Sequence, residues 1–404
     1  MIHDALIIGG GPAGATTAWL LARAGWAVAL IEKASYPRRK VCGEFISATT
    51  LALLHNLGLG EIFQNMAGPP VREVGLYAGK HRLTAPMPEN NNSGLWGRAL
   101  GREHLDSLLL EGARKAGAEI LQPCLATELT RQNGIFICRT DAPGQNPDRE
   151  LQARVIVSAH GSWESGQLPT QIPKQKPQPH DLLAFKAHFT QTELSQGLMP
   201  LLAFPGGYGG MVHTDHGRVS LSCCIRRDTL QKIRTQEYYR AGDAVLAHIM
   251  KHCDGVRHAL ANARMDGAWL SSGPLRPGIR TMYNDGIFAA GNTAGEAHPV
   301  VAEGISMAMQ GAWLLAELLI ENRQKVLSGN TDHIGHDYAL AWRRHFAPRL
   351  RNAALFAHLA MRPAATKLLL PLFQYIPALL TVCTRFSGKT TKVIGMSPLI
   401  GRTL

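Results

Sequence analysis

Three glycines near the start of the chain have the spacing of a phosphate-binding turn. They form the pattern Gly9-x-Gly11-x-x-Gly14, which follows a short apolar run. In such a turn the first glycine permits a tight bend, the second lets the backbone approach a pyrophosphate, and the third lets helix and strand pack closely. Pro12 suits the first helical position because its missing N–H would have no partner there. The free N–H groups at the start of this helix then favour an anion.

A carboxylate stands at the end of the next apolar run. Glu32 directly follows residues 28–31, where an acid can accept hydrogen bonds from the ribose of an adenosine. A carboxylate there favours FAD or NAD over a cofactor with a 2′-phosphate. Turn, helix and acid together predict a dinucleotide-binding βαβ unit. The alternative is a glycine-rich turn in an unrelated α/β protein.

A later stretch has the features of a second cofactor contact. Residues 287–290 form a short apolar run that leads into Gly291-Asn292, and a long helix is expected to begin near Gly304, after Pro299. The first turn of a helix has N–H groups without partners, so it stabilises negative charge. A reduced flavin carries negative charge at its N1–C2=O edge, so this segment predicts a flavin site.

A basic loop with a thiol follows the first βαβ unit. The cations of residues 38–40 could neutralise phosphate or could be solvated, and Cys42-Gly43-Glu44 comes next. The thiol of Cys42 could lie against a cofactor ring. A small buried cysteine is the commoner case for a free thiol.

Composition limits the classes of function. The 404 residues carry a formal charge of +12, which permits an anionic partner, but no nucleic-acid-binding motif is present. Seven cysteines without a C-x-x-C pair argue against disulfides and zinc and favour a reduced, cytoplasmic setting. His213, Asp215 and His216 lie in a probable hairpin turn, and no metal site is expected there. We also expect no signal peptide and no membrane span.

The remaining elements follow from hydrophobic periodicity. Arg102 and Asp106 lie one turn apart on an amphipathic helix, so an ordinary ion pair between them is an open alternative to a cofactor contact. Helices are expected at about 12–24, from 47, across 102–116, across 231–252 and from 304; strands are expected at 5–8, 28–31, 71–77, 81–85, 127–129, 135–139, 153–158, 182–190, 201–204, 208–213, 219–225 and 287–290.

These motifs together resemble the para-hydroxybenzoate hydroxylase superfamily of FAD enzymes. The segment from Pro299 to Gly311 (PVVAEGISMAMQG), the run KVCGE at 40–44 and the glycine-rich hairpin at 206–210 are similar to its geranylgeranyl reductase-like branch. The resemblance implies FAD as the cofactor, with NADH or NADPH as a transient reductant. The cofactor-binding residues it and the motifs predict are Gly9, Gly11, Pro12, Ala13, Gly14, Glu32, Lys33, Arg39, Cys42, Gly43, Arg102, Gly161, Gly291, Asn292, Pro299, Glu303, Gly304 and Ile305. The predicted catalytic residues are Cys42, Pro299 and Gly304.

Some positions depart from the family pattern. Asn292 stands where the family usually has an Asp on the ribityl chain, and His160-Gly161 stands where many hydroxylases have Asp-Gly. The tryptophan-containing motifs expected of flavin halogenases and of the central sheet of prenyl reductases are absent. This absence disfavours halogenation and ranks prenyl reduction second.

The predicted fold class is α/β. A discontinuous Rossmann-like FAD-binding domain (1–70, 98–165 and 270–325) is expected beside a β-sheet substrate domain (71–97 and 166–269), followed by a helical C-terminal region (326–404). That last region is basic and apolar, and two prolines break it into short pieces. It either covers the substrate domain or also lies on an anionic membrane surface, where it would make a peripheral contact.

The resulting hypothesis is an NAD(P)H-driven FAD monooxygenase of a hydrophobic aromatic or lipid-like small molecule. The first alternative is a geranylgeranyl reductase-like enzyme that reduces an alkene or isoprenoid. The second alternative is a flavin-binding electron carrier without turnover.

Overall fold

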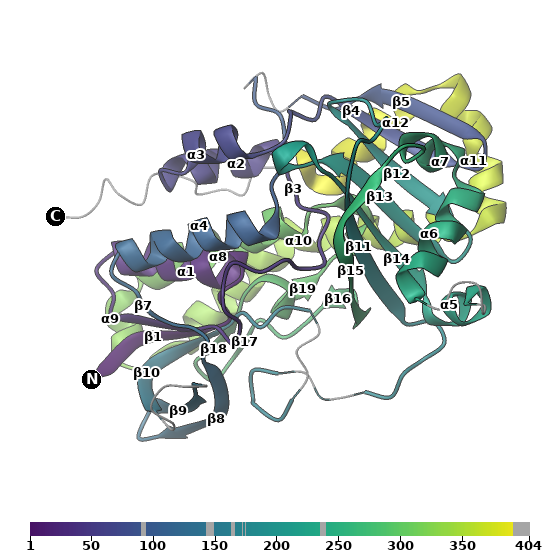
Figure 1. Ribbon diagram of the computed structural model, residues 1–404. Coiled ribbons are helices and arrows are strands. Elements are labelled where there is room, and N and C mark those ends of the chain that lie inside the picture. The colour runs from purple at the N-terminus through teal and green to yellow at the C-terminus, as the bar shows by residue number, and fades with distance from the viewer. Residues whose placement is uncertain are drawn as a thin grey trace.

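The computed structural model describes residues 1–89, 94–142, 149–162, 166–171, 173, 175–234 and 240–390. Two β-sheets lie side by side, with helices between and around them (Figure 1). The last fourteen positions of the expected helical C-terminal region, 391–404, fall outside the described residues. The α/β class and the pairing of a largely parallel sheet with an antiparallel one are confirmed.

The first sheet contains the dinucleotide-type βαβ unit. Its strand order is β17-β18-β10-β1-β2-β7, and β8 and β9 extend it as a hairpin on β10. The pairs β1–β10, β1–β2, β2–β7 and β10–β18 are parallel, so these strands end at the same edge. The strands are β1 (Ile2–Ile8), β2 (Val28–Ile31), β7 (Glu119–Leu121), β8 (Leu125–Gln132), β9 (Ile135–Asp141), β10 (Arg149–Ser158), β17 (Tyr283–Asn284) and β18 (Ile287–Ala289).

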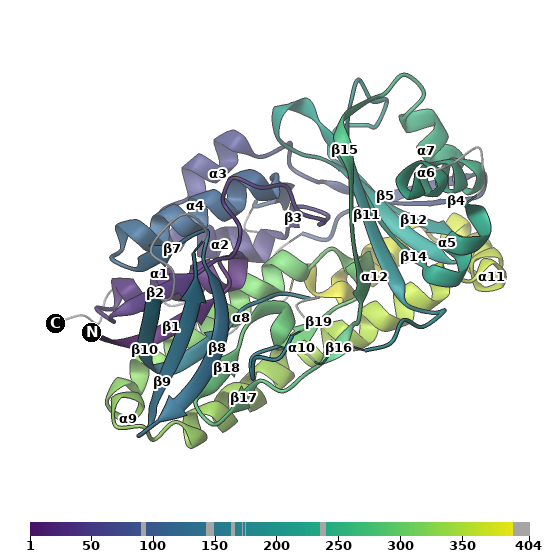
Figure 2. The ribbon, with the colours of Figure 1, turned by 60° about the horizontal axis from the view of Figure 1, so that its bottom comes forward.

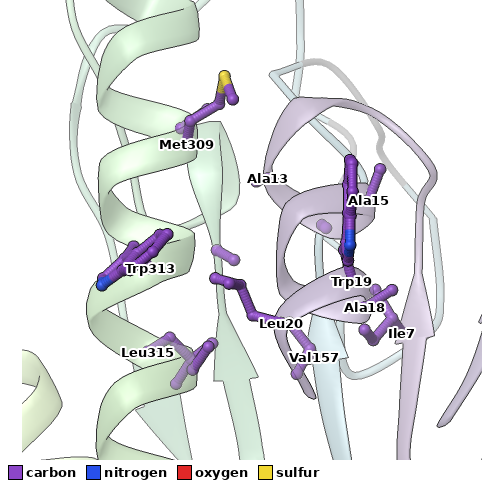
Figure 3. Close-up of a cluster of buried hydrophobic side chains, with 14 of the residues drawn as sticks. Ile7, Ala13, Ala15, Ala18, Trp19, Leu20, Val157, Met309, Trp313 and Leu315 are labelled. Carbon is purple, nitrogen blue, oxygen red and sulfur yellow. The ribbon is translucent and has the colours of Figure 1, made fainter. Parts of the chain in front are cut away.

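Helices cover one face of this sheet and the β8–β9 hairpin covers the other. Alternate residues of β1 divide between the faces: Ile7 packs with the helices, whereas Leu6 packs against Phe136 of β9. Because both faces of the sheet are buried, the sequences of its strands are nearly continuous apolar runs. Figure 3 shows Trp19 of α1 and Trp313 of α8 within the helical layer. The covering helices are α1 (Pro12–Arg23), α4 (Arg102–Lys115) and α8 (Gly304–Glu321).

The second sheet is mostly antiparallel. Its strand order is β15-β11-β14-β13-β12-β4-β5, with only β4 and β12 parallel to each other. The strands are β4 (Glu73–Ala78), β5 (His81–Pro86), β11 (Leu182–Thr190), β12 (Leu198–Phe204), β13 (Gly207–His213), β14 (Val219–Arg226) and β15 (Arg264–Leu275). The expected domain boundary at 270 falls inside β15, which pairs with β11 from Arg264 to Leu275.

Each face of the second sheet has a different cover. Phe185 and Leu202 pack against α6 (Ala241–His252) and α7 (Asp254–Ala259), on the outer face. Ala184 and Tyr208 lie on the other face, whose hydrophobic cluster includes residues of the C-terminal helices. Figure 2 shows these helices, coloured yellow-green to yellow, alongside the second sheet. They are α10 (Asp332–Ala360), α11 (Pro363–Tyr375), α12 (Ala378–Thr384) and the π-helical turn η4 (Arg385–Lys389).

The prediction of one continuous helix across 231–252 is wrong. The stretch 231–252 is not continuous: α5 (Arg227–Ile233) ends before α6 begins at Ala241, and Arg234 is extended. The sequence pattern resembled one long helix because apolar residues continue on both sides of the break. Both helices bury such residues in the same hydrophobic cluster, Leu230 from α5 and Val245 from α6. The remaining elements are short: β3 (Phe45–Ile46), α2 (Ala48–Asn56), α3 (Gly60–Met66), β6 (Arg98–Ala99), η1 (Asp215–Gly217), β16 (Gly278–Ile279), η2 (Gly291–Thr293), β19 (Gly295–Glu296), η3 (Pro299–Val301) and α9 (Arg323–Leu327).

Candidate functional site

The glycine turn between β1 and α1 has the shape of a phosphate cradle. Gly9 has φ = +112°, and a Cβ there would lie 2.3 Å from the carbonyl oxygen of Ala159. A Cβ on Gly14 would lie 1.8 Å from the oxygen of Gly9, so helix and strand touch at this point. A Cβ on Gly11 would meet only the guanidinium of Arg102, at 3.8 Å, because this glycine opens into a cavity. No side chain caps the N-terminus of α1. The turn therefore fits a pyrophosphate.

Glu32 lies buried at the same edge of the sheet and lines the cavity. Its carboxylate accepts hydrogen bonds from the N–H of Gly10 at 2.8 Å and the N–H of Ala34 at 2.9 Å. The guanidinium of Arg38 lies 3.4 Å away. These contacts fix the carboxylate beside the glycine turn, as the ribose contact predicted for it requires.

Arg102 occupies the first position of α4 and lines the cavity. The expected ion pair with Asp106 is present and bidentate, with N–O distances of 2.7 and 2.6 Å. Burial lowers the pKa of Arg102, but Asp106 and the thiol of Cys42 outweigh it and raise that pKa above its ordinary value. The ion pair and the cavity position are thus both present: Asp106 holds a charged guanidinium at the cavity wall.

The late segment reaches the same cavity from the opposite side. Gly291 and Asn292 follow β18, and Asn292 donates from its amide to Ser162 Oγ at 2.6 Å. Pro299 begins η3, and Gly304 begins α8, whose N-terminus has no side-chain cap. A Cβ on Gly304 would meet no atom within 4 Å. An open, uncapped helix N-terminus fits the anionic edge of a reduced flavin.

Most of the predicted cofactor-binding residues surround one space. The following line the cavity: Gly11, Pro12, Ala13, Glu32, Cys42, Gly43, Arg102, Gly161, Gly291, Asn292, Pro299, Gly304 and Ile305. Gly9 and Gly14 shape the turn behind this wall. Because both halves of the predicted FAD site converge here, the residues present fit FAD as one continuous ligand.

Besides Gly9 and Gly14, three predicted cofactor contacts do not line the cavity. Lys33 is exposed. Arg39 is directed to the second sheet, where its guanidinium binds Asp266 at 2.9 Å. Glu303 is fully buried and pairs with Lys389 of η4 at 3.3 Å. A cofactor role for these three residues stays a prediction, and the partners of Arg39 and Glu303 link distant parts of the chain instead.

A buried ionic cluster behind Cys42 was missed by the sequence reasoning. The carboxylate of Glu44 accepts hydrogen bonds from Lys186 Nζ and from His188 Nε2, the latter at 2.8 Å, and both partners come from β11. Glu44 and Lys186 are 0% exposed and Glu44 has φ = +63°. Burial would raise the pKa of Glu44, but His188 and Lys186 lower it to about 2. The sequence did contain a sign of this cluster, because Lys186 and His188 lie on one face of an otherwise apolar strand.

A possible metal-ligand group occurs away from the cavity. His104 comes close enough to Asp215 and His216 to supply the third ligand that the sequence did not identify. The carboxylate of Asp215, however, already accepts from the N–H of Gly101 at 2.6 Å and from Arg218. Because the cation of Arg218 occupies the place of a metal, we assign no metal site to this group.

The cavity, of about 530 Å³, continues from the cofactor turn to the C-terminal helices. Its far wall is apolar and includes Leu76 and Met199 from the second sheet and Leu370 and Phe373 from α11. Polar groups also line the cavity, and the hydroxyl of Tyr208 lies 3.2 Å from His298 Nδ1. Burial and His358 lower the pKa of His298 to about 4, so its imidazole is neutral at pH 7.

Comparisons with known proteins agree with this geometry. Residues 3–354 match the family described as FAD binding domain. The chain is 25% identical over 338 residues to conditioned medium factor receptor 1 of Dictyostelium discoideum, covering 79% of this chain and 64% of that protein. It is 24% identical over 331 residues to digeranylgeranylglycerophospholipid reductase 2 of Methanopyrus kandleri, covering 80% and 78%.

Among solved structures, the flavin-dependent brominase Bmp2 has the same fold. It superposes with a TM-score of 0.77 at 18% identity, over 96% of this chain and 94% of the brominase. At this identity the likeness concerns the fold alone. The family match spans both sheets and includes every predicted cofactor-binding residue. The chain therefore belongs to the FAD-binding domain family of para-hydroxybenzoate hydroxylase-like oxidoreductases.

Proposed function

We propose that this FAD-dependent oxidoreductase reduces a carbon–carbon double bond in a long, isoprenoid-like lipid. The observation that carries the proposal is the continuity of the cavity, which runs from Gly11 in the phosphate cradle to Leu370 and Phe373 on α11. Its apolar far wall suits an extended hydrocarbon chain. The likeness to a digeranylgeranylglycerophospholipid reductase over most of both chains supports the same substrate class.

Bound FAD supplies the redox chemistry, passing a hydride from NADH or NADPH to one alkene carbon while a proton goes to the other. The chain's own residues position the reactants. The uncapped N-termini of α1 and α8 stabilise anionic groups, and the apolar wall excludes water. The thiol of Cys42 and the hydroxyl of Tyr208 both line the cavity and are the candidate proton donors.

Oxygen transfer is the second candidate function, and the sequence ranked it first. The polar pair of Tyr208 and His298 favours it, because a hydroxyl and a neutral imidazole side by side can orient a phenolic substrate. The apolar character of the far wall reverses the ranking, since such a wall suits a hydrocarbon chain better than a phenolic ring.

The decisive experiment separates the two reactions by their products. The purified, FAD-loaded protein is incubated with NADPH or NADH and a geranylgeranyl lipid, with and without oxygen, and products are analysed by mass spectrometry. We expect two hydrogens added per double bond under anaerobic conditions, and loss of that product in a Gly11→Val variant. A product that gains an oxygen atom and forms only in air would overturn the reductase proposal in favour of the monooxygenase.

The same preparation tests the electron-carrier alternative. A catalyst consumes NADH or NADPH in proportion to product, whereas a carrier without turnover would hold FAD and oxidise neither nicotinamide when lipid is added. Cys42→Ala is the informative variant for the reductase, because it should lower the rate of the protonation step; its FAD content, measured in parallel, separates this effect from a loss of cofactor.

A further inference from the structure

The C-terminal helices have two apolar faces, and only one of them meets the cavity. On α11, Leu370 and Phe373 line the cavity wall. Leu368, Leu372 and Tyr375, spaced at i, i+4 and i+7, are 79%, 46% and 86% exposed on the same helix. These three residues lie on one stripe, because residues at this spacing share a helical face.

The exposed stripe continues along the chain. Ile376 is 48% exposed at the end of α11, and Val382 and Phe386 are 45% and 62% exposed in α12 and η4. We call these six residues the tail patch: Leu368, Leu372, Tyr375, Ile376, Val382 and Phe386. Single exposed hydrophobic residues are normal, but a run of them within nineteen positions marks an interaction surface.

The charges around the tail patch have one sign. No Asp or Glu occurs anywhere from Tyr338 to the end of the sequence, whereas this stretch carries ten Lys and Arg. Lys367 and Arg385, which directly precede Leu368 and Phe386 of the tail patch, are exposed, and so is Arg362 just before α11. An exposed apolar stripe with cations at its edges fits the boundary between anionic headgroups and acyl chains.

The helices are suited to lie on a bilayer and not to cross it. Among the described residues no single helix is long and apolar enough to span a membrane, and the pair formed by α11 and the segment from Ala378 to Lys389 is bent by 116°. A break of this size at Pro377 turns the second segment back toward the protein, where Thr381 donates to the carbonyl of Pro86. The tail patch can therefore enter the interface while the helices remain docked.

We propose that the tail patch docks this protein on an anionic lipid bilayer and that α11 separates the bilayer from the cavity. This inference rests on the proposed function with a lipid-like substrate. In this arrangement the substrate has to pass only one helix on its way from the membrane to the cavity. The exposed stripe and part of the cavity wall lie on the same helix, α11, and this favours lipid over a protein partner. A protein bound on this surface would block the shortest route of the substrate into the cavity.

Flotation with vesicles tests the docking without any need for turnover. Full-length, FAD-loaded protein is mixed with vesicles of phosphatidylcholine alone or with added phosphatidylglycerol. We expect binding to the anionic vesicles, weakened when salt shortens the electrostatic range from about 10 Å at 0.1 M to about 3 Å at 1 M. A Leu372→Gln/Tyr375→Gln variant should bind at least about tenfold more weakly.

A matched control is available elsewhere on the surface. Ile62 of α3 is 45% exposed, close to Leu372 at 46%, and Ile62→Gln should leave vesicle binding unchanged. A Lys367→Gln/Arg385→Gln variant should lose the preference for anionic lipid. All variants should keep the melting temperature of the parent and its reaction with detergent-dispersed substrate, so failure of the proposed reaction is distinguishable from failure of docking.

Two results would overturn the proposal. One is an absence of vesicle binding, or equal binding by the Leu372→Gln/Tyr375→Gln variant and its parent. The other is a dimer in light scattering that this variant converts to a monomer while vesicles bind neither form, which would assign the tail patch to a second copy of the chain.

Discussion

Replacing Glu44 by Gln should destabilise the protein strongly, although the change removes no atom from the core. The substitution leaves the ammonium of Lys186, which is 0% exposed, without its counter-charge. Breaking a buried pair in this way typically costs ~3–5 kcal/mol. The pKa of Glu44, lowered by His188 and Lys186, has the matching sign, because a carboxylate that its partners hold charged stabilises the folded state at neutral pH.

The assay is thermal unfolding of Glu44→Gln and the parent across pH. For a protein of 404 residues, a loss of about 3 kcal/mol lowers the melting temperature by roughly 3–4 °C. The stabilisation by a carboxylate with a lowered pKa is complete above the unfolded value of 4.5 and is lost as pH falls toward 2. The difference between variant and parent should therefore be full at pH 7 and shrink below about pH 4.5.

Two controls make the test specific. Glu128→Gln removes a carboxylate that pairs with Arg139 on the surface, where both side chains are more than half exposed, and should cost at most about 1 kcal/mol. Combining Glu44→Gln with Lys186→Met removes both buried charges and should restore at least half of the lost stability. The reasoning is refuted if Glu44→Gln melts no lower than Glu128→Gln.

Three further predictions concern the cofactor turn and the tail. Gly11→Val should fold but bind FAD at least about a hundredfold more weakly, since its side chain enters the cradle. Gly14→Ala should fail to fold, because its Cβ would lie 1.8 Å from a carbonyl oxygen. Circular dichroism reports folding and flavin fluorescence reports FAD binding, so the two measurements separate these outcomes. Lys389→Met leaves the carboxylate of Glu303 buried and unpaired, so it should lower stability by about 3 kcal/mol and speed proteolysis of the C-terminal helices; an unchanged digestion pattern would contradict this. Lys40 lines the cavity, and burial together with the guanidinium groups of Arg102 and Arg38 lowers its pKa to about 8. FAD affinity should therefore fall as pH rises through 8 and should stay level in Lys40→Gln, as titration calorimetry would reveal.

The parts of the structure that local sequence pattern determines were predictable. The turn at Gly9 and the strand 28–31 followed from residue types and spacing, and the strand expected at 182–190 coincides with β11. Each of these signals lies within a few residues of the feature it predicts, because backbone conformation and alternating burial are local properties.

Pairings between distant residues were not predictable in the same way. Glu44 and Lys186 are 142 positions apart, and Arg39 meets Asp266 across 227 positions. Periodicity indicates that a side chain is buried but not which partner it meets, so Arg39 was assigned to the cofactor for its charge alone. The glycine turns and helix starts that border the cavity were predictable because they depend on backbone geometry, which local sequence encodes; their contact with FAD stays a prediction.

The walls of the cavity come from two stretches of chain, one inside the family match and one beyond it. The match to the family ends at residue 354, yet Leu370, Phe373 and Leu380 beyond it line the far end of the cavity. The stretch that holds the predicted flavin contacts is thus distinct from the stretch that closes the substrate end. Under the proposed function, changes in α11 and α12 would alter the length of lipid chain that fits while the residues around the glycine turn stay the same. An exchange of this segment between relatives would then change the chain-length preference and leave the predicted flavin contacts unaltered.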